Sequence, residues 1–166
     1  MDEPQFWTLV ESAKASAGAS LDQRPVALES LLLAQSLESI QSFQHRYDEL
    51  LIRANRWDLW GAAYLMNDGC SDDGFRYFRD WLISEGRAAF EQALADPDCL
   101  AEIPKCESFE LELFGYAALE AYEKNGGGEL ERDFMQVEAA PPGARTWSKA
   151  RLPGLFPRLA AKYPGR

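Results

Sequence analysis

The sequence predicts an all-α fold: a single-domain helical bundle of about six helices with an irregular basic C-terminal arm. Apolar residues recur at helical spacing through most of residues 3–124, and no segment alternates apolar and polar residues for more than a few positions. A chain of 166 residues, 46% of them hydrophobic, suits one domain with a substantial core. We therefore expect an acidic helical domain at 1–138 and a proline-containing basic arm at 139–166, docked on that body.

The N-terminal helices are expected from caps and apolar spacing. Asp2 and Gln5 have the spacing of a capping box, which predicts a helix over residues 3–16. A short second helix is expected in VALESLLLAQ, after Pro25. The third helix has the clearest periodicity in the chain, and its period continues beyond a break near Asn55. Its apolar positions are Leu37, Ile40, Phe43, Tyr47, Leu50 and Leu51.

Further helices are expected after the polar loop NDGCSDDG. Ser71 is a natural N-cap for the next helix, and Gly86 permits a bend before its apolar face continues. Asp96 followed by Pro97 is typical of another helix start. A last strong helix is expected from Ser108 to about Lys124, where the glycine-rich NGGGE ends it.

The C-terminal arm differs from the body in composition and charge. AAPPGA is typical of a linker, and FMQVEA just before it would make at most one short strand. Residues 139–166 hold six Lys and Arg and no acidic residue, so all 27 acidic residues belong to the body. We expect the arm to lie across this acidic body rather than to bind an anion in trans. Its expected anchors are Trp147, Leu155, Phe156 and Tyr163.

Composition also bears on the class of protein. No stretch approaches the roughly 18 apolar residues of a membrane span, and the acidic start MDEPQFWTLV is unlike a signal peptide, which favours the cytoplasm. A formal net charge of −10 disfavours nucleic acid as a partner, except through residues 145–166. Three cysteines without CxxC spacing and a single histidine argue against a zinc site. We expect no cofactor, and buried free thiols at Cys70, Cys99 and Cys106.

The candidate site lies in RWDLWGAAYLMNDGCSDDGFRYFRDWLISEGR, residues 56–87, which holds three of the five tryptophans. Structural roles explain most of it, because aromatic side chains pack, Ser71 caps, and acidic residues favour the first turn of a helix. Alternatively, the same residues surround a polar pocket between the tryptophans that holds a small ligand or a partner's side chain. The candidate binding residues are Trp57, Asp58, Trp60, Asn67, Asp72, Asp73, Arg76, Arg79 and Trp81.

Two chemical alternatives use the acidic side chains of the same loop. Carboxylate and amide oxygens could bind a hard cation, although the order N-D-G-C-S-D-D-G departs from the common calcium loop. A pair of carboxyl groups could instead act as general acid and base. No motif supplies a nucleophile, so we assign neither catalytic residues nor metal ligands.

At this segment the chain resembles a bacterial family called domain of unknown function 4240. The resemblance rests on the segment just quoted, on FEQALADPDCL after it, on Phe6-Trp7 and on ESFELELFGYAALEAYEKNG. It covers roughly residues 3–125 and implies a cytoplasmic bacterial protein. The resemblance implies no activity, cofactor or catalytic residue, and the basic arm lies outside it.

These observations favour one function over two others. We expect a cytoplasmic bacterial binding or interaction module that recognises a basic protein partner or a small ligand near the 57–82 helix–loop–helix, because an acidic surface attracts basic partners. The alternative is an enzyme that uses carboxylates of the Asn67–Gly74 loop, with or without a divalent cation. A nucleic-acid adaptor acting through residues 145–166 is a third, weaker hypothesis.

Overall fold

The computed structural model describes residues 1–165, which form helices and connecting loops without a strand. The all-α prediction is confirmed, but seven α-helices lie within residues 1–124 alone, so the predicted number of about six helices is too low. They are α1 (Glu3–Ala17), α2 (Gln23–Leu33), α3 (Leu37–Arg53), α4 (Trp57–Met66), α5 (Asp72–Ser84), α6 (Arg87–Ala95) and α7 (Ala117–Lys124). Two 3-10 helices, η1 (Pro97–Glu102) and η2 (Glu112–Tyr116), connect α6 to α7.

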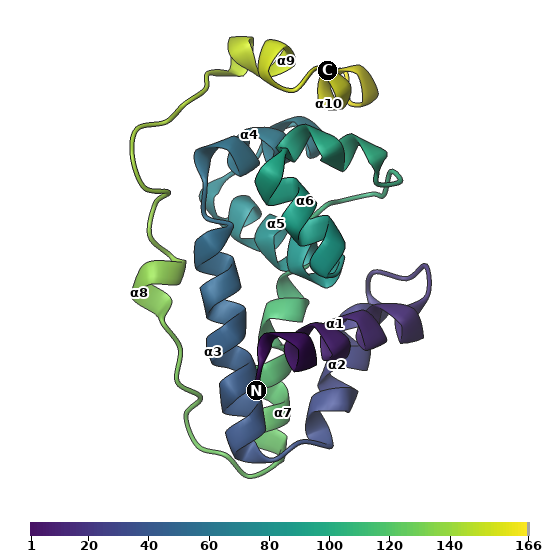
Figure 1. Ribbon diagram of the computed structural model, residues 1–166, viewed down its shortest axis with the longest axis vertical. Helices are drawn as coiled ribbons and strands as arrows, with labels where there is room; N and C mark the ends of the chain where they lie inside the picture. The colour runs from purple at the N-terminus through teal and green to yellow at the C-terminus, as the bar shows by residue number, and fades with distance from the viewer. Residues whose placement is uncertain (166) are drawn as a thin grey trace.

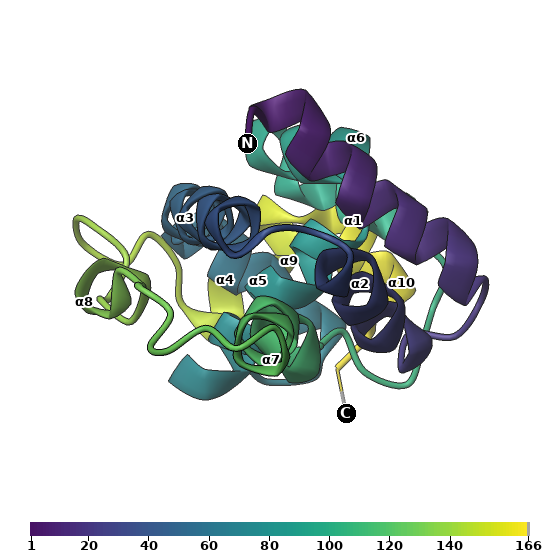
Figure 2. The ribbon, with the colours of Figure 1, turned by 90° about the horizontal axis from the view of Figure 1, so that it is seen from below.

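The helices form two groups that meet at α5 (Figure 1). In the lower group, α2 packs against α1 and α7, and α7 also contacts α3. The upper group contains α4, α5 and α6. Figure 2 shows α1 on one side of α3 and the short helix α8 (Phe134–Val137) on the other. Ten of the 13 residues of α5 are buried, so this helix carries much of the core and positions the site described below.

Local sequence signals set several helix ends as expected. Asp2 and Gln5 form both bonds of the capping box. The hydroxyl groups of Ser36 and Ser71 each accept a backbone N–H from the first turn of α3 and α5, at 3.2 Å and 3.1 Å. Helix α3 ends just before Asn55 and α4 begins just after it, which confirms the expected break.

The last helix of the body begins later than the predicted Ser108. The backbone N–H of Phe109 donates to Asn67 Oδ1 at 3.0 Å, and the N–H of Leu111 donates to the carbonyl of Tyr77 at 3.0 Å. These donors bond to neighbouring elements, so residues 108–111 form a connection rather than a first helical turn.

Residues 125–148 run along the outside of α3, and the chain then crosses the top of the molecule (Figure 1). The segment FMQVEA was expected to contain at most a strand but contains the helix α8, which Asp133 caps by accepting the N–H of Gln136 at 3.3 Å. The short helices η3 (Lys149–Arg151), α9 (Leu152–Leu155) and α10 (Pro157–Lys162) follow, so the prediction of an irregular arm is wrong for this stretch.

The C-terminal segment packs on α4. A Cβ atom at Gly61 would lie 3.0 Å from Leu152 and from Phe156, so glycine is needed for this close approach. Leu155, which was expected to be an anchor, is 42% exposed, and Tyr163 is only half-buried. The buried apolar side chains of this segment are Trp147, Leu152, Phe156 and Leu159.

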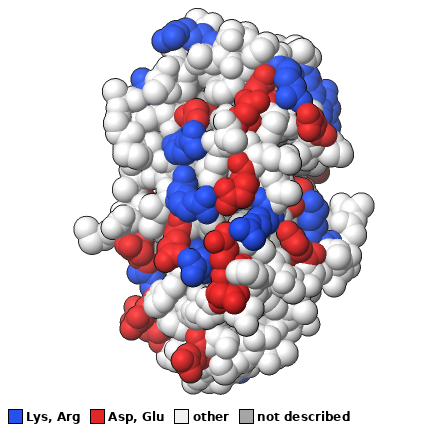
Figure 3. Space-filling model, in the orientation of Figure 1, with Lys and Arg blue, Asp and Glu red and all other residues white. Residues whose placement is uncertain are grey.

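The surface and the cysteines differ from simple expectation. Figure 3 shows Lys and Arg interspersed with Asp and Glu across the middle of one face, not a patch of one sign. The three cysteines are free, but Cys70 and Cys99 are half-buried and Cys106 is exposed, so the expectation of buried thiols is wrong. Among the described residues, no helix has both the length and the apolar character needed to cross a membrane.

Candidate functional site

The tryptophans of the candidate segment belong to one chain of aromatic contacts. Trp57 stacks on Trp60 with ring centroids 5.3 Å apart, and Trp60 stacks on Phe75 at 4.9 Å. The indole N–H of Trp60 donates to the carbonyl of Cys70 at 2.9 Å, which ties α4 to the loop before α5. Trp60 and Phe75 therefore hold α4 and α5 together.

Trp81 lies deeper in the same chain of rings. It contacts Phe78 at 5.3 Å and Phe109 at 5.0 Å, and only 1% of its surface is exposed. The expected pocket walled by all three tryptophans therefore does not form, because two core phenylalanines lie between Trp60 and Trp81.

A cavity of about 300 Å³ opens beside the stacked pair Trp57 and Trp60. Asp72, Asp73 and Arg79 also line it, so five of the nine predicted residues meet here. The other lining residues are Asn55, Phe75, Glu138, Ala139, Ala140 and Pro141.

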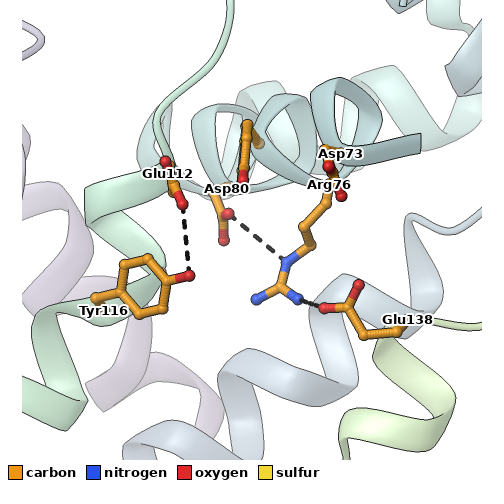
Figure 4. A pocket seen from close by; sticks show the side chains of 8 residues that line it. Asp73, Arg76, Asp80, Glu112, Tyr116 and Glu138 are labelled. Carbon is orange, nitrogen blue, oxygen red and sulfur yellow. Dashed lines mark hydrogen bonds and ion pairs between the residues drawn. The ribbon is translucent and has the colours of Figure 1, made fainter. Parts of the chain in front are cut away.

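A second cavity, of about 220 Å³, adjoins the first (Figure 4). The two share Asp73 and Glu138 as lining residues, and Arg76 joins the predicted set in the second one. We call the two cavities together the acidic cleft. The second cavity is also lined by Tyr77, Asp80, Glu112, Gly115 and Tyr116.

Three predicted residues lie outside the acidic cleft. Asp58 pairs with Arg56 at 2.5 Å, and its other oxygen accepts the N–H of Leu59 at 2.8 Å. Asn67 accepts the N–H of Phe109, as described above, and Trp81 lies in the core. The structure gives Asp58 and Asn67 structural roles outside the cleft.

Asp80 is the most buried carboxylate of the cleft. Its Oδ1 accepts the hydroxyl of Tyr47 at 2.6 Å, and its Oδ2 faces Arg76 Nε at 3.6 Å, beyond hydrogen-bond distance. Burial raises the pKa of Asp80 to about 6, against the opposing effects of Arg76 and Tyr47. Gly115 allows this position, because a Cβ there would lie 2.7 Å from Asp80 Oδ1.

The two arginines of the cleft are held in different ways. Arg76 bonds the carboxylate of Glu138, and Figure 4 shows its guanidinium between Glu138 and Asp80. Arg79 donates to the carbonyls of Leu51 at 2.9 Å and Val137 at 3.2 Å, and burial lowers its pKa to about 10. Each arginine thus lines one of the two cavities, but Arg79 is bonded to backbone carbonyls, whereas Arg76 is bonded to the carboxylate of Glu138.

A family model described as protein of unknown function (DUF4240) matches residues 1–124. The chain belongs to this family. No curated protein and no solved structure matches it. The DUF4240 region contains every predicted site residue, but Glu138 and the lining residues 139–141 follow it in the chain.

Buried charges of the DUF4240 region find partners beyond its end. Asp48 binds the guanidinium of Arg132 at 2.7 Å, and its other oxygen accepts the N–H of Asp133 at 3.0 Å. Glu138 and Val137 likewise hold Arg76 and Arg79. Residues 132–143 are therefore tied to the family domain by polar contacts, and we call them the strap.

Sequence reasoning missed several polar residues of the cleft, among them Asp80, its hydrogen-bond partner Tyr47, and Glu138. A signal was present for Asp80, because it follows Arg76 by four residues and lies between Arg79 and Trp81 on a helix with few exposed positions. No comparable signal exists for Glu138, which reaches the cleft through the path of the strap. Within residues 1–165, no group of three or more His, Cys, Asp or Glu is arranged to hold a metal ion.

Proposed function

We propose that this protein is a binding module that receives a cationic group, from a basic protein partner or a small ligand, in the acidic cleft. The observation that carries the proposal is the convergence of Trp57, Trp60, Asp72, Asp73 and Arg79 around one cavity of about 300 Å³. Concave sites with a few polar groups and an aromatic wall are the usual form of ligand sites. The three free thiols are typical of a reducing compartment, which supports a place in the bacterial cytoplasm.

Charge favours a cation over an anion in this cleft. Arg79 is already engaged by backbone carbonyls, and Arg76 by Glu138. The lining carboxylates are Asp72, Asp73, Asp80, Glu112 and Glu138. Carboxylates grouped in a concave surface focus a negative potential, which raises the local concentration of cations.

The aromatic wall adds a second attraction for the same kind of ligand. Trp57 is only half-buried, and it is stacked on Trp60 at the edge of the cavity. A guanidinium or ammonium group near an indole is stabilised by about 0.5–1 kcal/mol at an exposed site. Tyr77 and Tyr116 line the adjoining cavity, so both cavities have aromatic rings as well as carboxylates in their lining.

The test is titration of a hexa-arginine peptide into the protein at low and high salt. Asp73 lines both cavities, and we expect Asp73→Asn to weaken binding several-fold at low salt. Asp58→Asn is the matched control, because it removes the same charge from a neighbouring residue that pairs with Arg56 outside the cleft. Equal weakening by both variants would show that the peptide responds to net charge alone, and the proposal would be wrong.

A second candidate function is an enzyme that uses carboxylates of the Asn67–Gly74 loop, with or without a divalent cation. One observation favours it: Asp73, from that loop, lines the same cavity as Asp80, whose pKa of about 6 suits proton exchange near neutral pH. Titration with Mg²⁺ tests the version that uses a cation. Heat of binding that disappears in Asp72→Asn/Asp73→Asn would support it, and absence of any binding by the wild-type protein would remove it.

A further inference from the structure

A cavity larger than either cavity of the acidic cleft lies at the other end of α5. Its volume is about 430 Å³, and it lies between the α1–α2 turn, the end of α5 and residues 103–109. Figures 1 and 2 both place the α1–α2 turn on the opposite side of α3 from the strap. We call this cavity the basic pocket, and it contains only one of the predicted site residues, Trp81.

The walls of the basic pocket are mainly apolar. Trp81 and Phe109 meet edge to face at 5.0 Å, and both are almost fully buried. Leu21, Ile103 and Pro104 complete the apolar lining. Burial of a ligand's apolar body against such walls contributes about 25 cal/mol per Å² of apolar area removed from water.

The charged lining residues are predominantly cationic. Lys14, Arg24 and Lys105 line the pocket together with one carboxylate, Glu85. Glu85 accepts from Lys14 at 2.9 Å and from Arg24 Nη1 at 2.6 Å, so it engages two cations at once. Lys105 is 5.3 Å from the ring of Tyr163 and has no ion pair among the described residues. A cationic excess in a protein of net charge −10 is a local feature that favours an anion.

Arg24 gives this excess a fixed position. Its residue surface is only 7% exposed, and Nη1 bonds both Ser84 and Glu85. Arg24 also lines the pocket, and guanidinium groups bind carboxylates in paired geometry.

We propose that the basic pocket is a second binding site, which takes a small organic monocarboxylate with an aromatic or branched apolar body. The apolar body packs between Leu21, Trp81 and Phe109. The carboxylate lies toward Arg24 and Lys105, whose charges Glu85 does not fully offset. This site is independent of the acidic cleft in both position and ligand charge, so either can fail without the other.

The probes are 3-phenylpropionate, 3-phenylpropylamine and propionate, titrated into the full chain by calorimetry. The first two have the same apolar body and opposite charge, and the third has the charge without the body. We expect 3-phenylpropionate to bind most tightly of the three, with a dissociation constant of about 1 mM or lower.

Variants then assign the binding to this pocket. Lys105→Gln is expected to weaken 3-phenylpropionate binding about two- to five-fold, which is typical of one exposed charge pair. Lys149→Gln is the matched control, because Lys149 is an exposed lysine that does not line the pocket. Arg24→Lys keeps the positive charge near Glu85 but removes the planar guanidinium, and we expect it to weaken binding more than Lys105→Gln does.

Several results would overturn the proposal. Binding of 3-phenylpropylamine as tight as that of 3-phenylpropionate would show that the pocket does not select an anion. Equal binding of propionate would show that the apolar walls contribute nothing. Equal effects of Lys105→Gln and Lys149→Gln, or no binding of 3-phenylpropionate at about 10 mM, would remove the site.

Discussion

The acidic cleft and the basic pocket lie at opposite ends of α5 and have opposite charge. The cleft is lined by more carboxylates than arginines, and two arginines are already held by the strap or by backbone carbonyls. The pocket is lined by three cations and one carboxylate. One helix of 13 residues thus contributes to two cavities of opposite charge.

The difference shows what the aromatic residues of the α4–α5 segment do. Trp60 and Phe75 face the cleft, whereas Trp81 and Phe109 face the pocket, and Phe78 contacts both Phe75 and Trp81. The rings therefore form a continuous apolar partition between two polar sites. Because these rings are packed against one another, they separate the charged groups of the cleft from those of the pocket.

The largest expected effect comes from removing the middle of this partition. Trp81→Ala should cost about 3–5 kcal/mol of unfolding free energy, because it leaves a cavity between Phe78 and Phe109. Trp57→Ala should cost less by about 1 kcal/mol or more, since Trp57 is only half-buried. Urea denaturation measures both. A greater loss for Trp57→Ala would mean that the tryptophan beside the cleft, and not Trp81, contributes more to the stability of the fold.

The next effect concerns the pH dependence of the cleft. The pKa of Asp80 is about 6 in the folded protein, above the value of about 3.9 for an unfolded chain, so the folded state binds more protons between these values. Stability should therefore fall as pH rises from about 4 to about 6, by about 3 kcal/mol for a shift of this size. Denaturant midpoints of wild type and Asp80→Asn across this range measure it.

The pH comparison has a clear control. Asp58→Asn leaves Asp80 in place and should keep the wild-type slope over the same range. If stability falls with pH as steeply in Asp80→Asn as in the wild type, another group causes the pH dependence. The raised pKa of Asp80 would then be wrong.

A smaller effect is expected from the glycine that faces Asp80. Gly115→Ala should cost about 1–3 kcal/mol, because the new Cβ would lie 2.7 Å from Asp80 Oδ1 in a packed interior. Gly154→Ala is the control, since no atom lies within 4 Å of a Cβ built there. Equal stability of the two variants would show that the Asp80 side chain moves away from the new Cβ at little cost, despite its burial.

The smallest effect is expected at the rim of the cleft. Glu138→Gln removes the partner of Arg76, but the Glu138 side chain is 54% exposed, so water screens the pair and the loss should stay below about 1 kcal/mol. Glu102→Gln, at the exposed pair with Arg158, should behave alike. A loss above about 2 kcal/mol for Glu138→Gln alone would show that the ion pair of Glu138 with Arg76 is shielded from water like a buried pair.

Much of the fold followed from local patterns. The capping box at Asp2 and the N-cap at Ser71 acted as expected, because such bonds join residues three positions apart. The break near Asn55 was equally predictable from the interrupted period. The start of the last helix was misplaced because Phe109 bonds Asn67, 42 residues earlier, and no local pattern reports that contact.

The lining of the cleft was predicted in part for the same reason. Trp57, Asp72 and Asp73 meet because α4 and α5 are joined by a short loop, so neighbours in sequence are neighbours in space. Trp81 was assigned to the wrong cavity, since helical spacing cannot tell which of two cavities a buried ring faces. The basic pocket was not predicted at all, because Arg24 and Glu85 are 61 residues apart.

The sequence by itself determined the all-helical fold, several helix caps and the segment that holds the cleft, because these depend on residues within about one helical turn. Only the tertiary structure decided which charges are buried together. Tyr47 reaches Asp80 across 33 residues, and Arg132 reaches Asp48 across 84. Contacts at such separations depend on how helices pack and on where the strap runs. The opposite charges of the two cavities are therefore a property of packing that composition does not contain.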